Sequence, residues 1–177
     1  MNTMADKNYV LSYEAAQEKL HRMALEIAEL VSEEEVPLVL IGIRQSGTVI
    51  AEKICRLLEQ YIKVKPQVIS IMLDKHLPKE ISLSEEIDFT GKNVIFVDDV
   101  SNSGRTLMYA LRPLLDFHPR RVLVLVLVER MHKQFPIKPD FVGVSVATTV
   151  EDYIQVEIQN GEVIGAFVKS VSVVDKV

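Results

Sequence analysis

The sequence has 177 residues, a length typical of one compact domain, and we expect residues 1–177 to form a single unit. Hydrophobic residues make up 48% of the chain and charged residues 25%, which excludes disordered and fibrous classes. The formal net charge of -5 argues against a generally basic protein that coats nucleic acid through its phosphates.

A first β-α-β unit is predicted after an N-terminal helix. The helix is expected at residues 12–34 with Ser12 as its N-cap, because its apolar residues recur every three or four positions. Strands are predicted at 37–43 and 66–73, with helical spacing at 48–58 between them. The apolar face of the first helix is expected to contain Leu20, Met23, Ala24, Ile27 and Leu30.

A second unit follows, with a strand at 93–99, a helix at 106–117 and a strand at 120–130. Residues 122–128 of the last strand are all Val or Leu, which is typical of a strand covered on both faces. Alternating strands and helices predict an α/β fold, a mostly parallel twisted sheet flanked by helices. The turn dipeptide Asn160-Gly161 predicts a C-terminal hairpin, preceded by a small hood of short strands at about 129–150.

The sequence contains no sign of export or membrane insertion. Its longest apolar runs are far shorter than the ~20 residues that a membrane-spanning helix requires, and no signal-like apolar segment is seen near the first residue. We expect a cytoplasmic protein. The single cysteine, Cys55, lies on the apolar side of the second predicted helix, so a packed, reduced thiol is expected rather than a nucleophile.

Two adjacent carboxylates, Asp98 and Asp99, end the strand of the second unit, where ligands bind in open parallel sheets. A loop of small polar residues follows and leads into a helix start, which is typical of a phosphate site. Carboxylates beside a phosphate would repel it unless they bind sugar hydroxyls or face a divalent cation. The pattern therefore indicates a sugar phosphate site with Mg²⁺. The loop residues are Ser101, Asn102, Ser103, Gly104, Arg105 and Thr106.

Other readings of this stretch are weaker. A solvated turn capped by one aspartate is the plain structural alternative. The spacing is not that of a nucleoside-triphosphate P-loop, and no dinucleotide-binding glycine fingerprint is present.

The segment VIFVDDVSNSGRT resembles the 13-residue phosphoribosyl pyrophosphate signature of the type I phosphoribosyltransferases. The chain is similar in particular to the branch that comprises the pyrimidine operon attenuator and uracil phosphoribosyltransferase. This similarity runs from about His21 to about Val156 and includes HRMALEIAE, LVLIGIRQSGTVIAEKI, DFTGKNVIFVDDV and PIKPDFVGVSVAT.

The resemblance implies a role for each motif. Asp98 and Asp99 match the acidic pair that holds the ribose hydroxyls and, directly or through water, Mg²⁺; residues 101–106 match the loop that binds the 5-phosphate. The segment IRQSG matches the loop that contacts pyrophosphate, where the family often uses a strained peptide bond, so a non-proline cis bond is to be sought around Arg44 and Gln45. This loop adds Ser46 and Gly47 to the expected binding residues.

Two further regions match less closely. Residues 74–88 correspond to the family's flexible lid, but the Tyr-Arg-Asp-Asp stretch of this branch is absent. Lys75 and His76 are candidates to supply positive charge in the lid, and the alternative is that both are solvated loop residues. The segment ERMHKQFPIKPDFVG matches the branch's hood, which places Arg130 and His132 where the base or the pyrophosphate would be handled.

The resemblance implies transfer of 5-phosphoribosyl from phosphoribosyl pyrophosphate to a nucleobase, with uracil favoured and a purine as the alternative. Asn102 stands where 6-oxopurine transferases carry a proton-transferring aspartate, and asparagine cannot act as that acid or base. A nucleotide-sensing, RNA-binding regulator and a degenerate transferase are the rival functions. RNA binding is less favoured because Lys19, Arg22, Lys53 and Arg56 form no clear basic stripe. The family further implies a homodimer or higher homo-oligomer.

Overall fold

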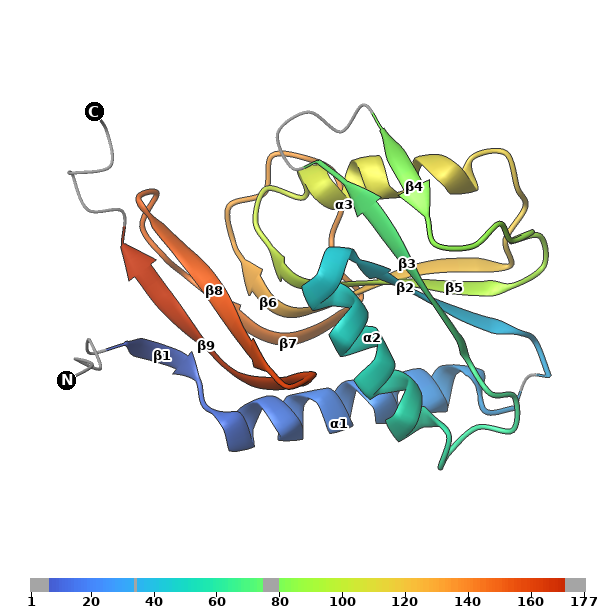
Figure 1. Ribbon diagram of the computed structural model, residues 1–177, viewed down its shortest axis with the longest axis horizontal. Coiled ribbons are helices and arrows are strands. Elements are labelled where there is room, and N and C mark those ends of the chain that lie inside the picture. The colour runs from blue at the N-terminus through green and yellow to red at the C-terminus, as the bar shows by residue number, and fades with distance from the viewer. Residues whose placement is uncertain (1–6, 34, 75–79, 171–177) are drawn as a thin grey trace.

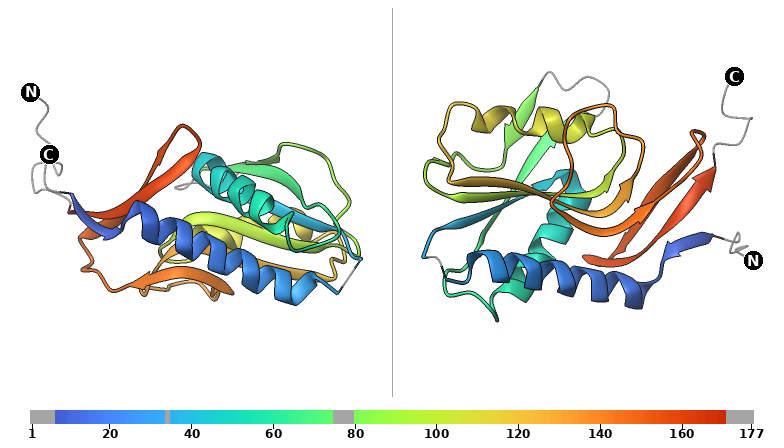
Figure 2. Two further views of the ribbon diagram at one scale, coloured as in Figure 1. Left: turned by 90° about the horizontal axis from the view of Figure 1, so that it is seen from below. Right: turned by 180° about the vertical axis from the view of Figure 1, so that it is seen from behind.

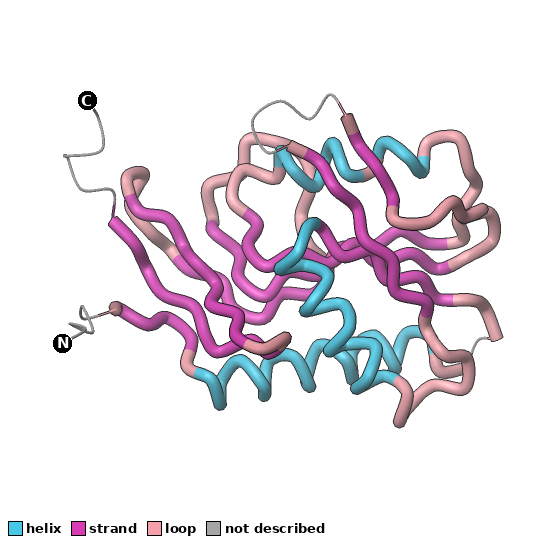
Figure 3. Tube along the Cα trace, viewed as in Figure 1, coloured by secondary structure: helices cyan, strands magenta, loops and turns pink. Residues whose placement is uncertain are grey.

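A computed structural model describes residues 7–33, 35–74 and 80–170 of the chain. Strands and helices alternate through most of it (Figure 1, Figure 3). In chain order the elements are β1 (Asn8–Leu11), α1 (Tyr13–Val31), β2 (Leu38–Ile43), α2 (Arg44–Leu58), β3 (Gln67–Leu73), β4 (Ile81–Leu83), β5 (Asn93–Ser101), α3 (Arg105–Ala110), a 3-10 turn (Arg112–Leu114), β6 (Arg121–Arg130), β7 (Phe141–Val146), β8 (Asp152–Gln159) and β9 (Glu162–Ser170).

The main sheet has six strands in the order β4-β3-β2-β5-β6-β7. All neighbours are parallel except β4, which pairs antiparallel with β3. The expected mostly parallel twisted sheet flanked by helices is confirmed. Since β7 is the edge strand of this sheet, residues 141–146 extend the main sheet, although they lie inside the segment expected to form a hood.

Alternate residues of the central strands feed two cores, one on each face of the sheet. Leu40 of β2 and Val97 of β5 face a core shared with α1 and α2. Ile41 and Phe96, their neighbours in sequence, face a core that contains the buried residues of α3. Successive side chains of a strand point to opposite faces, so both faces of the sheet are covered, with α1 and α3 on opposite sides (Figure 1).

A separate three-stranded sheet, in the order β1-β9-β8, lies beside the main sheet (Figure 1, Figure 2). The predicted C-terminal hairpin is confirmed: β8 and β9 are joined through Asn160 and Gly161, whose φ angles of 51° and 75° fit the two-residue turn that Asn-Gly favours. Strand β1 was not expected from its own four residues, because its pairing partner, β9, lies at the other end of the chain.

The helices differ from the predicted ones in ways with local causes. Ser12 is the N-cap of α1, as expected, and its Oγ accepts a hydrogen bond from the Ala15 N–H at 3.2 Å. Leu30, expected on the buried face, is 40% exposed. The helix predicted at 106–117 ends as α3 at Ala110 and continues as a 3-10 turn, because Pro113 has no N–H to extend the α-helical ladder.

Part of the predicted lid belongs to the main sheet. Strand β4 pairs with β3 at three positions, and in one of these pairs Ile71 lies opposite Leu83. Lys75 and His76, the candidate cations of the lid, lie outside the described residues.

Cys55 is free and buried, as expected. Its Sγ donates to the carbonyl of Pro66 at 3.6 Å, and burial raises the pKa of the thiol. A thiol with a raised pKa is a poor nucleophile near neutral pH. Among the described residues, no helix is both long and apolar enough to cross a bilayer.

Candidate functional site

The carboxyl ends of β2 and β5 meet at one edge of the main sheet. The two strands are parallel neighbours, with Gly42 opposite Val97, so β2 ends at the level of Asp98 while β5 continues to Ser101. The first turn of α2 packs directly on β5 at Gly47, where an added Cβ would lie 2.3 Å from the Val97 carbonyl oxygen. This close approach brings Arg44, the first residue of α2, beside Asp98.

Asp98 and Asp99 lie in different surroundings. Asp98 is 3% exposed, and its Oδ1 accepts a hydrogen bond from the Asp99 N–H at 2.9 Å. Asp99 is half-buried, and its Oδ1 accepts from the Val100 N–H at 2.8 Å. The two carboxylates differ because β5 is still extended here, so its successive side chains point in opposite directions. The role expected of both, binding the ribose hydroxyls, stays a prediction.

Burial strongly raises the pKa of the Asp98 carboxyl, and the neighbouring Asp99 raises it further, while Arg44 acts in the opposite direction. A carboxyl group whose pKa is raised on folding contributes stability below its unfolded pKa, and that contribution is lost as the pH rises through the folded pKa. Burying the Asp98 carboxyl thus lowers the stability of the fold near neutral pH, where the unfolded chain holds the same group as a solvated carboxylate.

We expect Asp98→Asn to raise the melting temperature at pH 7, because the amide oxygen can still accept from the Asp99 N–H and no charge is buried. The difference in melting temperature should shrink as the pH falls towards about 4, the pKa of an aspartate in the unfolded chain, below which the carboxyl is neutral in both states. Thermal unfolding followed between pH 4 and pH 8 measures it. A variant less stable than the wild type at pH 7 would show that burying the Asp98 carboxyl does not destabilise the fold.

The first cavity, of about 220 Å³, lies over the loop that follows β5. Arg44 and Asp98 line it together with residues 100–107, so the structure brings all six residues of the predicted phosphate loop to one cavity. Gly104 has a φ of 84°, a left-handed conformation that glycine adopts without strain. The loop is thus a tight turn of small polar residues, as the sequence predicted.

A second cavity, of about 600 Å³, lies on the other side of Arg44. It is lined by Ile43, Arg44, Gln45, Ser46, Met72 and Asp99. Gly47 lines neither cavity, since it packs against Val97. Arg44 and Asp99 therefore face a space separate from the phosphate loop and adjacent to it.

The predicted pyrophosphate loop differs from expectation in its backbone. Residues 44–47 form the first turn of α2, which begins four residues before the predicted helix. The cis bond sought around Arg44 is absent, as it is throughout the described residues. The unusual geometry is instead the φ of 53° at Arg44, a left-handed conformation that costs on the order of 1 kcal/mol for a residue other than glycine.

Arg44 is also unsatisfied in its hydrogen bonding. Its Nε is buried and has no hydrogen-bond partner among the described residues. A buried donor without a partner is costly, and it is commonly explained by a ligand or ion that completes the site. Because Arg44 lines both cavities, it is placed to bind an anion in either one.

Arg130 and His132, expected near the base or the pyrophosphate, line neither cavity. Arg130 donates to the Asn102 Oδ1 at 3.1 Å, the Thr148 Oγ1 at 2.8 Å and the Thr149 carbonyl at 3.0 Å. The His132 Nε2 lies 2.8 Å from the Thr148 carbonyl oxygen. Both side chains therefore fasten the end of β6 to residues 148–149, and only through Asn102 does Arg130 reach the phosphate loop.

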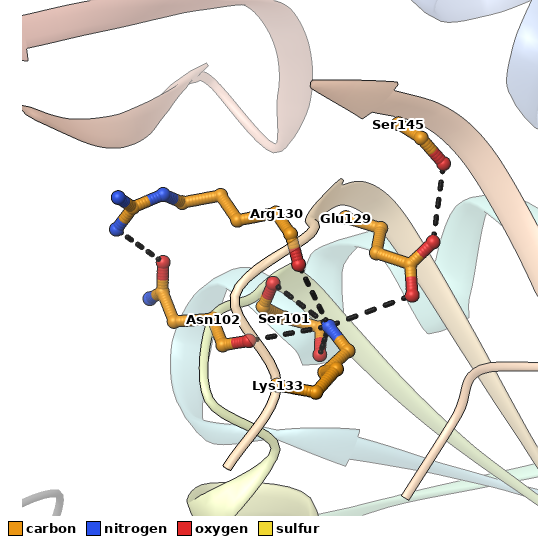
Figure 4. A network of polar contacts seen from close by, with 6 residues as sticks. All are labelled: Ser101, Asn102, Glu129, Arg130, Lys133 and Ser145. Atoms are coloured by element: carbon orange, nitrogen blue, oxygen red, sulfur yellow. Dashed lines mark hydrogen bonds and ion pairs between the residues drawn. The ribbon is translucent and has the colours of Figure 1, made fainter. Parts of the chain in front are cut away.

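Lys133 is the residue of this region that the sequence did not single out. Its ammonium group lies among oxygen atoms of Ser101, Asn102, Glu129 and Arg130 (Figure 4). Within the polar stretch ERMHKQF it looked like one more solvated residue. Its spacing of four residues from Glu129 was the only available signal, and in a nonhelical segment that spacing predicts nothing.

Comparison with known proteins identifies the class of this protein. Residues 10–160 match the phosphoribosyl transferase domain, and the chain belongs to that family. Among curated proteins, its relatives include the bifunctional protein PyrR of Latilactobacillus sakei, 36% identical over 134 residues that cover 69% of this chain and 75% of the relative. PyrR of Thermus thermophilus is 35% identical over 150 residues, covering 79% of this chain and 82% of the relative. The PyrR proteins form the branch of the pyrimidine operon attenuator, so the predicted membership of that branch is confirmed.

Solved structures share the fold. The hypoxanthine phosphoribosyltransferase of Trypanosoma cruzi aligns with a TM-score of 0.71 at 19% identity, over 80% of this chain and 82% of that one. A hypoxanthine-guanine phosphoribosyltransferase of Bacillus anthracis aligns with a TM-score of 0.67 at 24% identity, over 84% and 85% of the two chains. Their common fold is the type I phosphoribosyltransferase fold.

Proposed function

We propose that this protein transfers 5-phosphoribosyl from phosphoribosyl pyrophosphate to a nucleobase, most directly uracil, and releases pyrophosphate. The observation that carries the proposal is the placement of Arg44, which lines both the cavity of the phosphate loop and the cavity lined by Asp99, and whose buried Nε has no hydrogen-bond partner among the described residues. A donor with a phosphate at each end of a ribose needs two adjacent anion sites with a hydroxyl-binding group between them.

Each part of the donor is assigned to one part of the site. The 5-phosphate lies in the first cavity, against the backbone and hydroxyl groups of residues 101–106. Asp99 accepts hydrogen bonds from the ribose hydroxyls, and the buried carboxyl of Asp98 is its neighbour in β5. The pyrophosphate lies in the second cavity, where Arg44, Gln45 and Ser46 supply donors.

The reaction breaks the bond between C1 of the ribose and the pyrophosphate oxygen, and forms a bond from C1 to a ring nitrogen of the base, whose proton is released to solvent. Positive charge develops on the ribose and negative charge on the leaving group. Arg44 lines both cavities and can stabilise the negative charge of the leaving pyrophosphate, while the Asp99 carboxylate beside it can stabilise the positive charge on the ribose. No covalent intermediate with the protein is required, and the protein's work is positioning.

Magnesium fits this site as an ion that arrives with the donor. No cluster of three or more His, Cys, Asp or Glu side chains able to hold a metal occurs among residues 7–33, 35–74 and 80–170. Mg²⁺ usually binds one or two carboxylates together with substrate phosphates, and Asp99, with Asp98 behind it, provides that kind of partial site. Bound there, the ion would neutralise charge on the departing pyrophosphate.

Uracil is proposed as the acceptor because the curated relatives belong to the PyrR branch. Asn102 lines the first cavity and offers no acid or base for a purine. The hypoxanthine enzymes are less than 25% identical and support the fold alone, so a purine is the alternative acceptor.

RNA-binding regulation is the second candidate, since the relatives are named bifunctional. The basic residues considered for it are largely engaged within the chain. Lys53 and Arg56 both pair with Glu162, and Arg22 pairs with Glu26 and donates to two carbonyl oxygens of β7. The two carboxylates, Glu26 and Glu162, thus offset two of these three positive charges, which favours the enzyme over the regulator.

The deciding assay incubates the protein with Mg²⁺, phosphoribosyl pyrophosphate and one nucleobase at a time, and measures pyrophosphate release. Uracil-dependent release supports the proposal, and release with purines alone favours the alternative acceptor. Donor binding without release with any base would indicate a degenerate transferase or a nucleotide sensor. Salt-dependent binding of a structured RNA leader would support the regulator.

A further inference from the structure

We propose that Lys133 is a positioning residue that holds the phosphate loop, residues 101–106, with its backbone N–H groups directed at the ligand. This inference rests on the proposed function, because it assigns the loop to the 5-phosphate of the donor. Lys133 lines neither the first cavity nor the second, so it acts through the loop and not by touching the substrate.

The ammonium group of Lys133 binds the side of the loop that faces segment 130–135 (Figure 4). It donates to the Ser101 Oγ at 2.9 Å, the Asn102 carbonyl at 3.2 Å and, at the longer distance of 3.5 Å, the Ser101 carbonyl. It also donates to the Arg130 carbonyl at 3.0 Å and pairs with Glu129 at 3.5 Å. One side chain thus ties the end of β5 to the end of β6.

The next carbonyl of the loop is held from the same segment. The Ser103 carbonyl oxygen accepts from the backbone N–H groups of Gln134 and Phe135, each at 3.0 Å. Three successive carbonyl oxygens of the loop, those of residues 101, 102 and 103, are therefore bound by residues 133–135.

This arrangement determines where the loop's donors point. In a trans peptide the C=O and the N–H point in opposite directions, so fixing the three carbonyls directs the following N–H groups, those of residues 102, 103 and 104, to the other side of the loop. The first cavity is lined by residues 101–107 and by none of residues 130–135, so it lies on that other side. Residues 133–135 therefore bind one face of the loop, and the anion site lies on its other face.

Charge adds to the geometry. The Lys133 side chain is only 24% exposed, and Glu129, its ion-pair partner, is held in place by a hydrogen bond from the Ser145 Oγ at 3.1 Å. Desolvation lowers the pKa of Lys133, which agrees with its enclosed position. The positive charge of the ammonium group behind the loop also adds to the attraction of the N–H groups for a phosphate on the far side.

The test measures two ligands on Lys133→Met, which keeps most of the apolar stem and removes the donors. Ribose 5-phosphate probes the loop, and magnesium pyrophosphate probes the cavity of Arg44 and Asp99. We expect the Kd for ribose 5-phosphate to rise about ten- to a hundredfold, as for the loss of one or two charge-assisted interactions, and the Kd for magnesium pyrophosphate to change less than threefold. A purely structural role would weaken both ligands alike and would overturn the proposal, as would unchanged binding of ribose 5-phosphate.

Two further variants complete the experiment. Lys138→Met removes the same charge from an exposed position five residues away and should bind both ligands as the wild type does. If Lys133→Met does not fold, Lys133→Gln takes its place, because glutamine retains two donors without the charge. We expect its Kd for ribose 5-phosphate to be about tenfold higher than that of the wild type. An unchanged Kd in this variant would overturn the proposal. A wild type that binds neither ligand would refute the proposed function itself, which separates the two failures.

Discussion

Replacing Asp99 by asparagine is expected to lower kcat/KM for the phosphoribosyl donor by about a hundred- to a thousandfold while the melting temperature stays close to that of the wild type. Asp99 faces the second cavity and has an oxygen left to accept from ribose hydroxyls beyond the one that binds the Val100 N–H. A hydrogen bond to a charged group contributes about 1.5–3 kcal/mol, so weakening two of them accounts for the expected loss. Asparagine has nearly the same shape and can still accept from Val100.

Steady-state kinetics of pyrophosphate release, with thermal unfolding alongside, measures this effect. Asp116→Asn is the matched control, because it makes the same chemical change at an exposed residue that lines neither cavity, and it should leave both quantities unchanged. An Asp99→Asn protein with wild-type kcat/KM would remove Asp99 from the site. A large drop in its melting temperature would mean that its role is structural.

The second large effect is expected from Gly47→Ala, which should lower the free energy of unfolding by about 3 kcal/mol, at the upper end for an overpacked core. The added Cβ would lie 2.3 Å from the Val97 carbonyl oxygen, and that atom belongs to a central strand that cannot easily move. Pushing α2 away from β5 would also separate Arg44 from Asp98. Activity should therefore fall more than the folded fraction does.

Urea unfolding of Gly47→Ala and the wild type gives the difference directly. Gly91→Ala is the control: its Cβ would meet nothing within 4 Å, and only its φ of 73° is unfavourable for alanine. That strain should cost about 1 kcal/mol and leave kcat/KM unchanged. Equal losses of stability in the two variants would show that α2 and β5 separate more easily than their packing indicates.

Much of the fold could be predicted because its signals are local. The unbroken apolar strands, the helical periodicity of residues 12–34, the Ser12 cap and the Asn160-Gly161 turn each depend on a few neighbouring residues. The same holds for the phosphate loop, whose six residues are contiguous and all line one cavity. Strand β1 and the position of β7 in the main sheet depend on pairing with distant segments, and no short stretch of sequence encodes them.

The sequence by itself determined which residues form strand β5, the phosphate loop and the acidic pair. These residues follow one another in the chain, so they are also neighbours in space. Only the tertiary structure decided how Asp98 and Asp99 divide between burial and the second cavity, since that depends on the direction of each side chain against neighbouring strands. It also decided that Arg130 braces residues 148–149 and that Lys133 holds the loop. These contacts join residues 18 to 32 positions apart, and the pairing of β5, β6 and β7 in the main sheet, not the spacing along the chain, brings them together.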